Sequence, residues 1–284
     1  MQIAVLGMGE MGSRMALSLL HTGHSVTVWN RSADRVEPIL RQGAAGAPTP
    51  AAAVRNADVA FAMVRDDEAS RRIWLEPRDG ALVALSADAI AIESSTLSLP
   101  WIRELSGLCA ARKIAFLDAP VVGSRAQADT AQLIHLVGGD AQAFKRAAPA
   151  FAAIGAVAHH IGPSGTGAAL KLIVNAMLGV QVALLAELLG SAERLGLEIS
   201  RAVEVLAQTP PCSPAAKVAA ESIAKRSFAP AFPVELMAKD LAYLVDAIHP
   251  YAAPLSAAAC AVFEHAIKAK LGGDNMTAVA KLYD

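Results

Sequence analysis

Short apolar runs and amphipathic stretches alternate over the first 162 residues. A continuous apolar run of about five residues, such as residues 2–6, is typical of a strand buried on both faces of a sheet. Apolar positions at helical spacing fill the segments between the runs. The pattern predicts strands at 2–6, 26–29, 58–64, 89–94, 114–120, 133–139 and 158–162. Residues 7–25 have a glycine-rich start and helical periodicity after it, and further helices are predicted near 33–42, 66–75, 98–113 and 140–155. Such alternation indicates an α/β domain with a mostly parallel, doubly wound sheet.

The pattern changes after Gly162. Helical stretches separated by the segments PPCSP, FAPAFP and HPYAAP fill the rest of the chain, and no strand-like alternation returns. We therefore expect two domains: a Rossmann domain over residues 1–162 and an all-α domain over residues 163–284. A long interdomain helix, predicted from about 166 to 195, would join them.

The long predicted helix contains a lysine within an otherwise apolar stretch. Residues 168–189 are as long and nearly as apolar as a membrane span. They nevertheless contain Lys171, Asn175, Gln181 and Glu187, and charged groups are costly inside a bilayer. The pattern favours a core helix over a membrane helix, so the purpose of Lys171 needs another explanation.

The composition narrows the class of protein. Of the 284 residues 54% are hydrophobic and 18% charged, which suits a large core and an oligomer that hides further surface. The net charge of −1 without a basic cluster predicts no nucleic-acid partner. Three scattered cysteines and no evident export signal predict a cytoplasmic protein without disulfides. No metal-ligand spacing is present, so we expect no metal.

The segment GMGEMG, residues 7–12, fits the pattern G-x-G-x-x-G directly after a predicted strand and at the start of a predicted helix. Gly7 would permit the tight turn, Gly9 would let a pyrophosphate approach the backbone, and Gly12 would let the helix pack closely on the sheet. The helix N-terminus would supply N–H groups to the phosphates. The segment predicts a dinucleotide-binding site.

The end of the second predicted strand bears on the choice of cofactor. An acidic residue there would bind the ribose 2′-hydroxyl of NAD, but this chain has Asn30, Arg31 and Ser32. Because a guanidinium pairs well with a 2′-phosphate, these residues favour NADP, with NADPH preferred over NADH. The alternative is a surface arginine at a helix start that Ser32 caps.

Five segments together resemble the β-hydroxyacid dehydrogenase family, the relatives of 3-hydroxyisobutyrate dehydrogenase. They are GMGEMG, ESSTLSLP at 93–100, DAPVVGS at 118–124, GTGAALKLIVN at 165–175 and KDLAYL at 239–244. The resemblance implies an oxidoreductase with a Rossmann domain, a helical domain and assembly into a homodimer or homotetramer. Its substrate would be a small-molecule carboxylate.

The resemblance also implies roles for individual residues. Lys171 matches the family's catalytic lysine and Asn175 its companion, and both would also contact the substrate. The implied cofactor-binding residues are Gly7, Met8, Gly9, Glu10, Met11, Gly12, Asn30, Arg31, Ser32, Met63, Val64, Thr96 and Lys239. The other implied substrate-binding residues are Ser95, Val122, Gly123 and Ser124.

Purely structural interpretations, without a ligand, are alternatives at several of these positions. Ser95 and Thr96 could simply cap the following helix, for which Ser98 is also a plausible cap. Lys239 could be an ordinary surface lysine. Outside the implied site, Asp118 is expected to end a strand and order a loop, and Asp240 to be structural.

Two departures from the family pattern bear on the substrate. Val122 stands where many members have serine, and Ser124 where many have glycine. The N–H groups of Gly123 and Ser124, with the Ser124 hydroxyl, could still hold a carboxylate. This pairing resembles the glyoxylate and succinic semialdehyde reductase branch.

The expected function is therefore NADPH-dependent interconversion of a small aldehyde acid and its hydroxy acid. On a helix Lys171 and Asn175 share a face, and an ammonium there could protonate a carbonyl oxygen as hydride arrives at carbon. Two alternatives stay open. One is an imine reductase, although such enzymes generally lack this lysine. The other is an NADP-binding protein without turnover.

Overall fold

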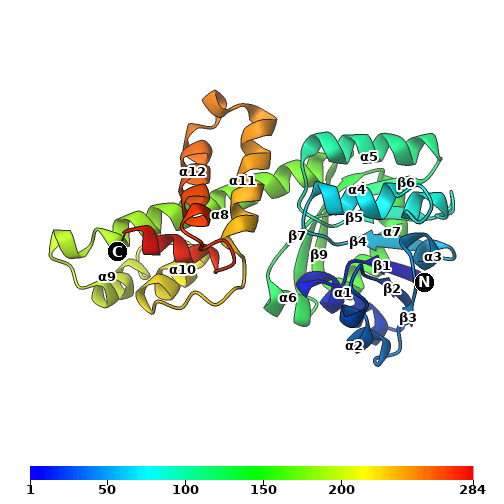
Figure 1. Ribbon diagram of the computed structural model, residues 1–284, viewed down its shortest axis with the longest axis horizontal. Coiled ribbons are helices and arrows are strands. Elements are labelled where there is room, and N and C mark those ends of the chain that lie inside the picture. Colours follow the sequence, from blue (N-terminus) through cyan, green and yellow to red (C-terminus); the bar gives the residue numbers. More distant parts are fainter. Residues whose placement is uncertain (284) are drawn as a thin grey trace. The chain divides into compact units, whose positions relative to one another are not determined.

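The computed structural model describes residues 1–283 and divides into two compact units, Met1–Lys171 and Leu172–Asp284 (Figure 1). The first unit is a mostly parallel sheet with helices on both faces. Helices make up the described part of the second unit, apart from a single β-bridge between Pro233 and Asn275. The predicted fold class, an α/β domain followed by an all-α domain, is confirmed.

The sheet of the first unit has the order β3-β2-β1-β4-β5-β6-β8-β7, and β9 pairs with β8. Its strands are β1 (Gln2–Leu6), β2 (Ser25–Trp29), β3 (Ala45–Gly46), β4 (Val59–Ala62), β5 (Ile90–Glu93), β6 (Ala115–Asp118), β7 (Val121–Val122), β8 (Leu133–Gly139) and β9 (Gly155–Gly162). Strands β1 to β6 run parallel, whereas β8 is antiparallel to β6 and β7. The strand order reverses at β1, which lies between β2 and β4. In open α/β sheets ligands bind at this point, beyond the carboxyl ends of the strands.

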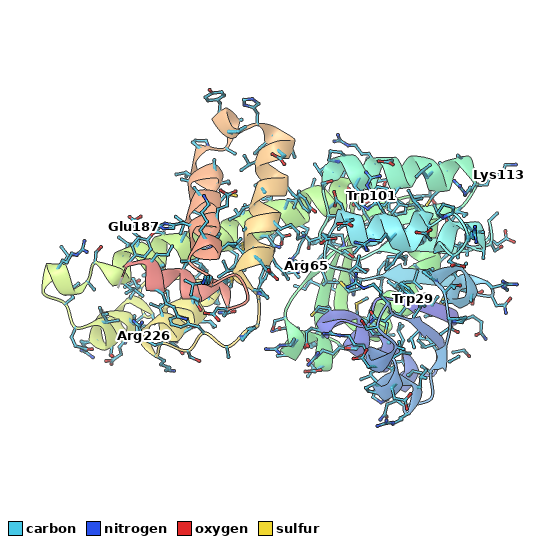
Figure 2. All side chains as sticks on the ribbon, in the orientation of Figure 1. Trp29, Arg65, Trp101, Lys113, Glu187 and Arg226 are labelled. Atoms are coloured by element: carbon cyan, nitrogen blue, oxygen red, sulfur yellow. The ribbon has the colours of Figure 1, made fainter. Side chains whose placement is uncertain are left out.

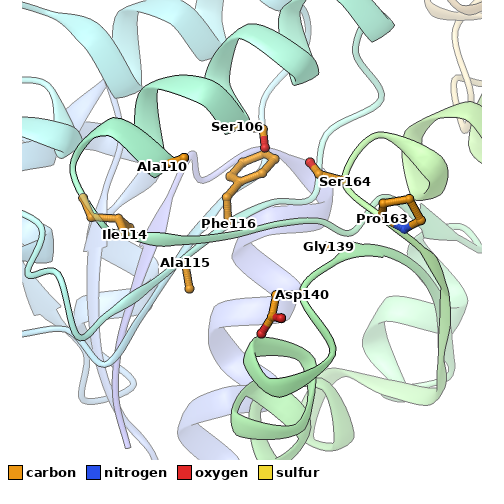
Figure 3. Close-up of a pocket in the computed structure, with 9 residues that line it drawn as sticks. All are labelled: Ser106, Ala110, Ile114, Ala115, Phe116, Gly139, Asp140, Pro163 and Ser164. Carbon is orange, nitrogen blue, oxygen red and sulfur yellow. The ribbon is translucent and has the colours of Figure 1, made fainter.

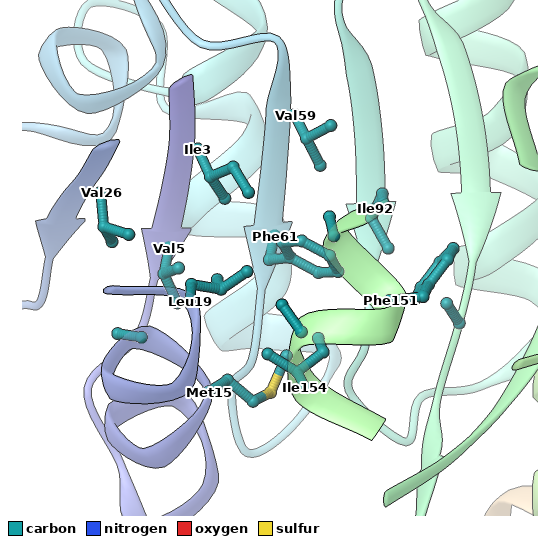
Figure 4. Packing of buried hydrophobic residues seen from close by; sticks show 14 of the residues in the cluster. Ile3, Val5, Met15, Leu19, Val26, Val59, Phe61, Ile92, Phe151 and Ile154 are labelled. Carbon is teal, nitrogen blue, oxygen red and sulfur yellow. The ribbon is translucent and has the colours of Figure 1, made fainter. Parts of the chain in front are cut away.

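Both faces of the sheet are covered, and the side chains of β1 show how. Ile3 and Val5 pack with Phe61 of β4 beneath α1 (Glu10–His21) and α7 (Ala141–Ile154), as Figure 4 shows. Ala4 and Leu6 point to the opposite face. That face is covered by α3 (Pro50–Val54), α4 (Asp67–Leu75) and α5 (Leu99–Ala111). Because alternate residues of a strand face opposite sides, a strand buried on both faces needs an unbroken apolar run, which β1 has.

Two predicted helices differ from those observed. The stretch 33–42 forms a 3-10 turn, η1 (Ala33–Arg35), and a short helix, α2 (Glu37–Leu40). Pro38 lacks the N–H that a continuous helix would need there. The long helix α8 (Thr166–Gly190) ends earlier than predicted, at a glycine. A side chain at Gly190 would lie 2.4 Å from Cβ of Tyr283.

The second unit is built around its own apolar core. After α8 its α-helices are α9 (Ile199–Leu206), α10 (Pro214–Ala224), α11 (Val234–Ile248) and α12 (Pro254–Lys268). Its 3-10 helices are η3 (Glu193–Leu195), η4 (Pro250–Ala252) and η5 (Met276–Tyr283), whereas the 3-10 helix η2 (Ala81–Val83) lies in the first unit. Helices α11 and α12 lie side by side (Figure 1). Fully buried side chains include Met237, Leu241 and Phe263. Gly179 brings α8 close to α11, since a Cβ there would lie 2.8 Å from the sulfur of Met237.

Helix α8 is long and apolar enough to cross a membrane by length and composition. Half of its most apolar window is buried within the protein. Among residues 1–283 it is the one helix that meets these criteria of length and composition. A long core helix that never enters a membrane meets them equally well.

A buried histidine lies on β8, towards one end of the sheet. His135 on β8 is fully buried, and its ring lies 5.0 Å from that of Phe151, centroid to centroid. Burial lowers the pKa of His135 to about 4, because the charged imidazolium is poorly solvated there.

His135 should make the protein sensitive to acid. Its pKa is lower in the folded protein than in the unfolded chain, so its contribution to stability is complete above about pH 6.5 and is lost as the pH falls towards 4. Acidification from about pH 7.5 to about pH 5 should therefore lower the free energy of unfolding by about 2 kcal/mol through this group alone. Urea unfolding of the protein at both pH values would measure this loss.

His135→Leu should remove that part of the acid sensitivity, whatever the substitution costs at neutral pH. His159→Asn is the matched control, because His159 lies exposed on the neighbouring strand β9. An equal loss of stability on acidification in the wild type and in His135→Leu would contradict the assignment.

Candidate cofactor and substrate site

The glycine-rich loop after β1 is packed too tightly for side chains at two of its three glycines. The N–H of Gly7 donates to the carbonyl oxygen of Trp29 at 2.8 Å. Gly7 has φ +105°, and a Cβ there would lie 2.3 Å from the carbonyl oxygen of Met63. A Cβ at Gly12 would lie 1.9 Å from the carbonyl oxygen of Gly7. The two glycines thus allow α1, the turn and the end of β4 to meet backbone to backbone.

Gly9 differs from the other two. It precedes α1 as its N-cap, and a Cβ built on it meets nothing within 4 Å in the described chain. No side chain among residues 1–283 caps this helix start. Open space over a helix N-terminus, with the helix dipole behind it, fits the pyrophosphate of a dinucleotide.

The end of β2 is tied to the glycine-rich loop through Asn30. Its Oδ1 accepts a hydrogen bond from the N–H of Met8 at 3.0 Å, and its Nδ2 donates to the carbonyl oxygen of Ser32 at 3.0 Å. Arg31 and Ser32 are exposed. Ser32 occupies the N-cap position of η1, but its side chain makes no capping bond within the described residues. Asn30 therefore positions the loop, and Arg31 projects from the surface next to it.

The loops after β4 and β5 are joined by Ser95. The N–H of Met63 donates to the carbonyl oxygen of Leu6 at 2.9 Å, and the N–H of Val64 donates to Oγ of Ser95 at 2.7 Å. Ser95 is buried, whereas Thr96 is half-buried. The hydroxyl predicted to contact substrate is thus turned into the protein. Its role as a substrate contact stays a prediction.

The helix after this loop is capped by Ser98, as the sequence suggested. Its Oγ accepts from the N–H of Trp101 at 3.3 Å, and Pro100 lies in the first turn. The alternative that Ser95 and Thr96 serve as the cap of α5 is therefore wrong.

Asp118, at the end of β6, anchors the start of α8. Its Oδ1 accepts from the N–H of Gly165 at 2.6 Å and its Oδ2 from the N–H of Ala168 at 2.8 Å. Burial raises the pKa of Asp118, and these hydrogen bonds oppose that rise by favouring the carboxylate. The side chain orders the loop before α8, as expected.

Lys171 follows one turn after this anchor and Asn175 one turn later, both buried on α8. Asn175 donates from Nδ2 to Oδ2 of Asp240 at 2.5 Å. Nζ of Lys239 lies 2.8 Å from Oδ1 of Asp240 and 4.7 Å from the ring centroid of Tyr243. The side chain of Lys239 is only 16% exposed, so the surface-lysine interpretation is wrong. Asp240 is structural, as predicted, and it orients Asn175.

The segment predicted to hold a substrate carboxylate has a capping role that the sequence analysis missed. Val122 lies in β7, Gly123 has φ +132°, and Ser124 precedes the short helix α6 (Arg125–Asp129). The N–H and the hydroxyl of Ser124 both donate to Oε1 of Gln127, at 2.9 and 2.7 Å. The spacing S-x-x-Q is a capping signature and could have revealed this. A carboxylate would have to replace Gln127 to use these donors.

One pocket lies away from these residues. It has a volume of about 350 Å³, and Figure 3 shows it between α5, the start of β6 and the turns after β8 and β9. Its lining residues are Ser106, Ala110, Ile114, Ala115, Phe116, Gly139, Asp140, Pro163 and Ser164. It contains none of the predicted site residues, so we assign it no part in catalysis.

The first unit, with its glycine-rich loop at the switch point of a doubly wound sheet, belongs to the class of dinucleotide-binding proteins. A family model described as the NAD binding domain of 6-phosphogluconate dehydrogenase matches residues 2–162. A second, described as NAD-binding of NADP-dependent 3-hydroxyisobutyrate dehydrogenase, matches residues 165–283. The chain belongs to the β-hydroxyacid dehydrogenase family.

Individual relatives carry different names. The chain is 32% identical to human cytokine-like nuclear factor N-PAC over 99% of its own length, but it spans only 51% of that protein. It is 31% identical to the chloroplastic glyoxylate/succinic semialdehyde reductase 2 of Arabidopsis thaliana, over 98% of this chain and 78% of the relative. It is 30% identical to a Pseudomonas aeruginosa protein named NAD-dependent L-serine dehydrogenase, over 100% of this chain and 98% of the relative.

A solved structure of another protein has the same fold as this chain. A structure of Mycobacterium tuberculosis 3-hydroxyisobutyrate dehydrogenase with L-serine matches with a TM-score of 0.90 and 30% identity. The match covers 99% of this chain and 98% of the other.

Substitutions at the glycines should separate packing from cofactor binding. Gly9→Ala should leave the melting temperature within about 2 °C, because its Cβ meets open space, yet weaken NADPH binding tenfold or more by blocking the pyrophosphate. Gly12→Ala should lower the melting temperature by several degrees, since its Cβ would overlap Gly7. Calorimetry and fluorescence titration with NADPH would measure the two effects.

Gly107→Ala on α5 is the matched control. A Cβ there also meets nothing within 4 Å, so neither stability nor binding should fall. Unchanged NADPH binding in Gly9→Ala would show that no phosphate lies over Gly9.

Proposed function

We propose that the protein is an NADPH-dependent oxidoreductase that interconverts a small aldehyde acid and the corresponding hydroxy acid. Membership of a family of hydroxyacid dehydrogenases supports the general reaction. The observation that carries the proposal for this chain is Lys171. It is a buried lysine on a helix whose first turn Asp118 fixes to the carboxyl end of β6, the edge of the sheet where ligands bind.

In this proposal Lys171 is the general acid and base. The nicotinamide, when bound, supplies or accepts the hydride at the carbon. Lys171 as an ammonium donates a proton to the carbonyl oxygen during reduction, and as an amine it accepts the hydroxyl proton during oxidation. Asn175, one turn away and held by Asp240, cannot titrate and would orient the lysine or the substrate oxygen.

The proposed substrates are small acids of the semialdehyde or glyoxylate type. Two observations support this class: the Gly123–Ser124 pair, and the relatives named glyoxylate/succinic semialdehyde reductase. The relative named NAD-dependent L-serine dehydrogenase widens the class to hydroxy acids that carry an amino group.

A second candidate function is cofactor binding without turnover. The name of the N-PAC relatives does not describe an enzyme, so similarity alone does not establish a reaction. The buried Lys171 and Asn175 favour the enzyme, because they lie one turn apart on α8 and match the catalytic pair that the family resemblance implies.

The first experiment is NADPH and NADH oxidation with a panel of glyoxylate, succinic semialdehyde, methylmalonate semialdehyde, tartronate semialdehyde and a cyclic imine. We expect one aldehyde acid to be turned over and the imine not to be. Lys171→Ala should then lower kcat by about 10³-fold, the usual contribution of a general acid, and leave the dissociation constant of NADPH within about twofold.

Lys217→Ala is the control for this variant, because Lys217 is an exposed lysine on α10. Most activity remaining in Lys171→Ala, or turnover of the imine alone, would overturn the proposed mechanism. Binding of NADPH without turnover of any acid would favour the second candidate.

We further propose that Arg31 makes NADPH the preferred cofactor. Its exposed guanidinium lies next to Asn30, which is bonded to the glycine-rich loop, so a 2′-phosphate bound along that loop could pair with it. Arg31→Ala should raise the KM for NADPH by about 10- to 100-fold and change the KM for NADH less than about twofold. Steady-state kinetics with both cofactors would measure this.

The exposed Arg35, four residues on, provides the control, and Arg35→Ala should leave both KM values unchanged. Equal effects of Arg31→Ala on NADPH and NADH would remove the basis for the NADP preference.

We also propose that the protein assembles into a homodimer or homotetramer. Four apolar side chains at helical spacing line one side of α8 and are about half exposed or more: Ile173, Met177, Leu184 and Leu188. Exposed apolar side chains in a row along a long helix are typical of a surface that another chain covers.

A further inference from the structure

A carboxylate that the proposed reaction does not use lies beneath the site. Glu93 is the last residue of β5, and its side chain is fully buried. Its Oε2 accepts from Oγ of Ser70 at 2.6 Å and from Nε1 of Trp74 at 2.8 Å. Its Oε1 accepts from the N–H of Ser95 at 3.0 Å. All of these donors are neutral, so hydrogen bonds alone stabilise this buried group.

The hydrogen bonds in this network have defined directions. The indole Nε1 of Trp101, labelled in Figure 2, donates to Oγ of Ser70 at 2.9 Å. Because an indole N–H can only donate, the single hydroxyl hydrogen of Ser70 must point to Glu93. At the other oxygen the backbone N–H of Ser95 is likewise a donor only. Both oxygens of Glu93 are therefore required as acceptors, and an amide could replace only one of them.

The network connects Glu93 to the glycine-rich loop through one side chain. Ser95 bonds to Glu93 through its backbone N–H and its hydroxyl, and its Oγ accepts from the N–H of Val64. Val64 in turn lies against the loop, since a Cβ on Gly7 would be 3.1 Å from Cγ1 of Val64 and 2.3 Å from the carbonyl oxygen of Met63. One buried carboxylate thus sets the spacing of the loops after β1, β4 and β5.

We propose that Glu93 is a positioning residue, which acts through Ser95 to hold the Met63–Val64 segment and Thr96 where they receive the nicotinamide half of the cofactor. The inference rests on the proposed function, which places those segments at the cofactor. It also explains why the Ser95 hydroxyl points inwards: the hydroxyl joins two loops and leaves the half-buried Thr96 as the neighbour that can face a ligand.

The test compares two ligands with Glu93→Gln. One is NADPH, and the other is 2′-phospho-ADP-ribose, the fragment of NADPH that lacks the nicotinamide ring. If Glu93 positions the nicotinamide loops, the variant should bind the fragment within about twofold of the wild type, while NADPH binding or kcat/KM falls by roughly 10- to 100-fold. A purely structural role would weaken both ligands equally, or would lower only the melting temperature.

Ser95→Ala keeps the test decisive even if Glu93→Gln does not fold, because it removes only the hydroxyl that joins the two loops. It should show the same difference between NADPH and the fragment. The double variant should be no worse than the more impaired single variant, since both residues act through one connection. Additive losses would overturn the proposal.

Trp101→Phe is the matched control within the same network. It removes the donor on the far side of Ser70 and leaves the bonds between Glu93 and Ser95 in place, so it should lower stability without changing NADPH binding. A loss of NADPH binding in Trp101→Phe equal to that in Glu93→Gln would indicate general damage and overturn the proposal.

Failure of the proposed function is distinguishable from failure of this inference. A wild-type protein that binds NADPH but reduces no substrate would remove the proposed reaction. The comparison of NADPH with the fragment would still decide the role of Glu93.

Discussion

The carboxylate of Asp118 fixes the helix on which the proposed chemistry depends. It ends β6 and accepts hydrogen bonds from two N–H groups at the start of α8, so sheet and helix meet at one side chain. Such bonds satisfy donors that the first turn of a helix otherwise leaves open, and they favour negative charge there. Burial works against the charge, but the hydrogen bonds keep the group useful as an acceptor. Together with the close backbone packing of Gly167 against β8, this anchor sets the position of Lys171 relative to the strand ends.

Two further carboxylates repeat this arrangement at other points of the proposed site. Glu93 joins loops that follow parallel strands, and Asp240 holds Asn175 and Lys239 in the helical unit. Each is buried, and each is satisfied by donors from segments far apart in the sequence. Buried acceptors of this kind contribute little net stability by themselves, but they restrict which arrangements of the chain satisfy every donor.

The sequence predicted those features that depend on local patterns. The apolar run of β1, the glycines at 7, 9 and 12 and the Ser98 cap follow from spacing alone, and all are present. It could not predict the inward turn of Ser95, because the partner Val64 is 31 residues away and belongs to another strand. Nor did it predict that β8 runs antiparallel to β6, since an apolar strand carries no mark of its direction. The capping of Ser124 by Gln127 was readable from the sequence, but the family resemblance directed attention to a ligand instead.

The contrast between the glycine-rich loop and the end of β2 has a consequence for how such a protein can change. Around Gly7 and Gly12 backbone lies against backbone, so almost any substitution there disturbs the fold. Arg31 and Ser32 are exposed, and exchanges at such positions usually alter stability by less than about 0.5 kcal/mol. If these residues face the ribose, as proposed, evolution or design could revise them without repacking the sheet. In that case cofactor selectivity and architecture would be carried by separate residues, and the first could change while the second stays fixed.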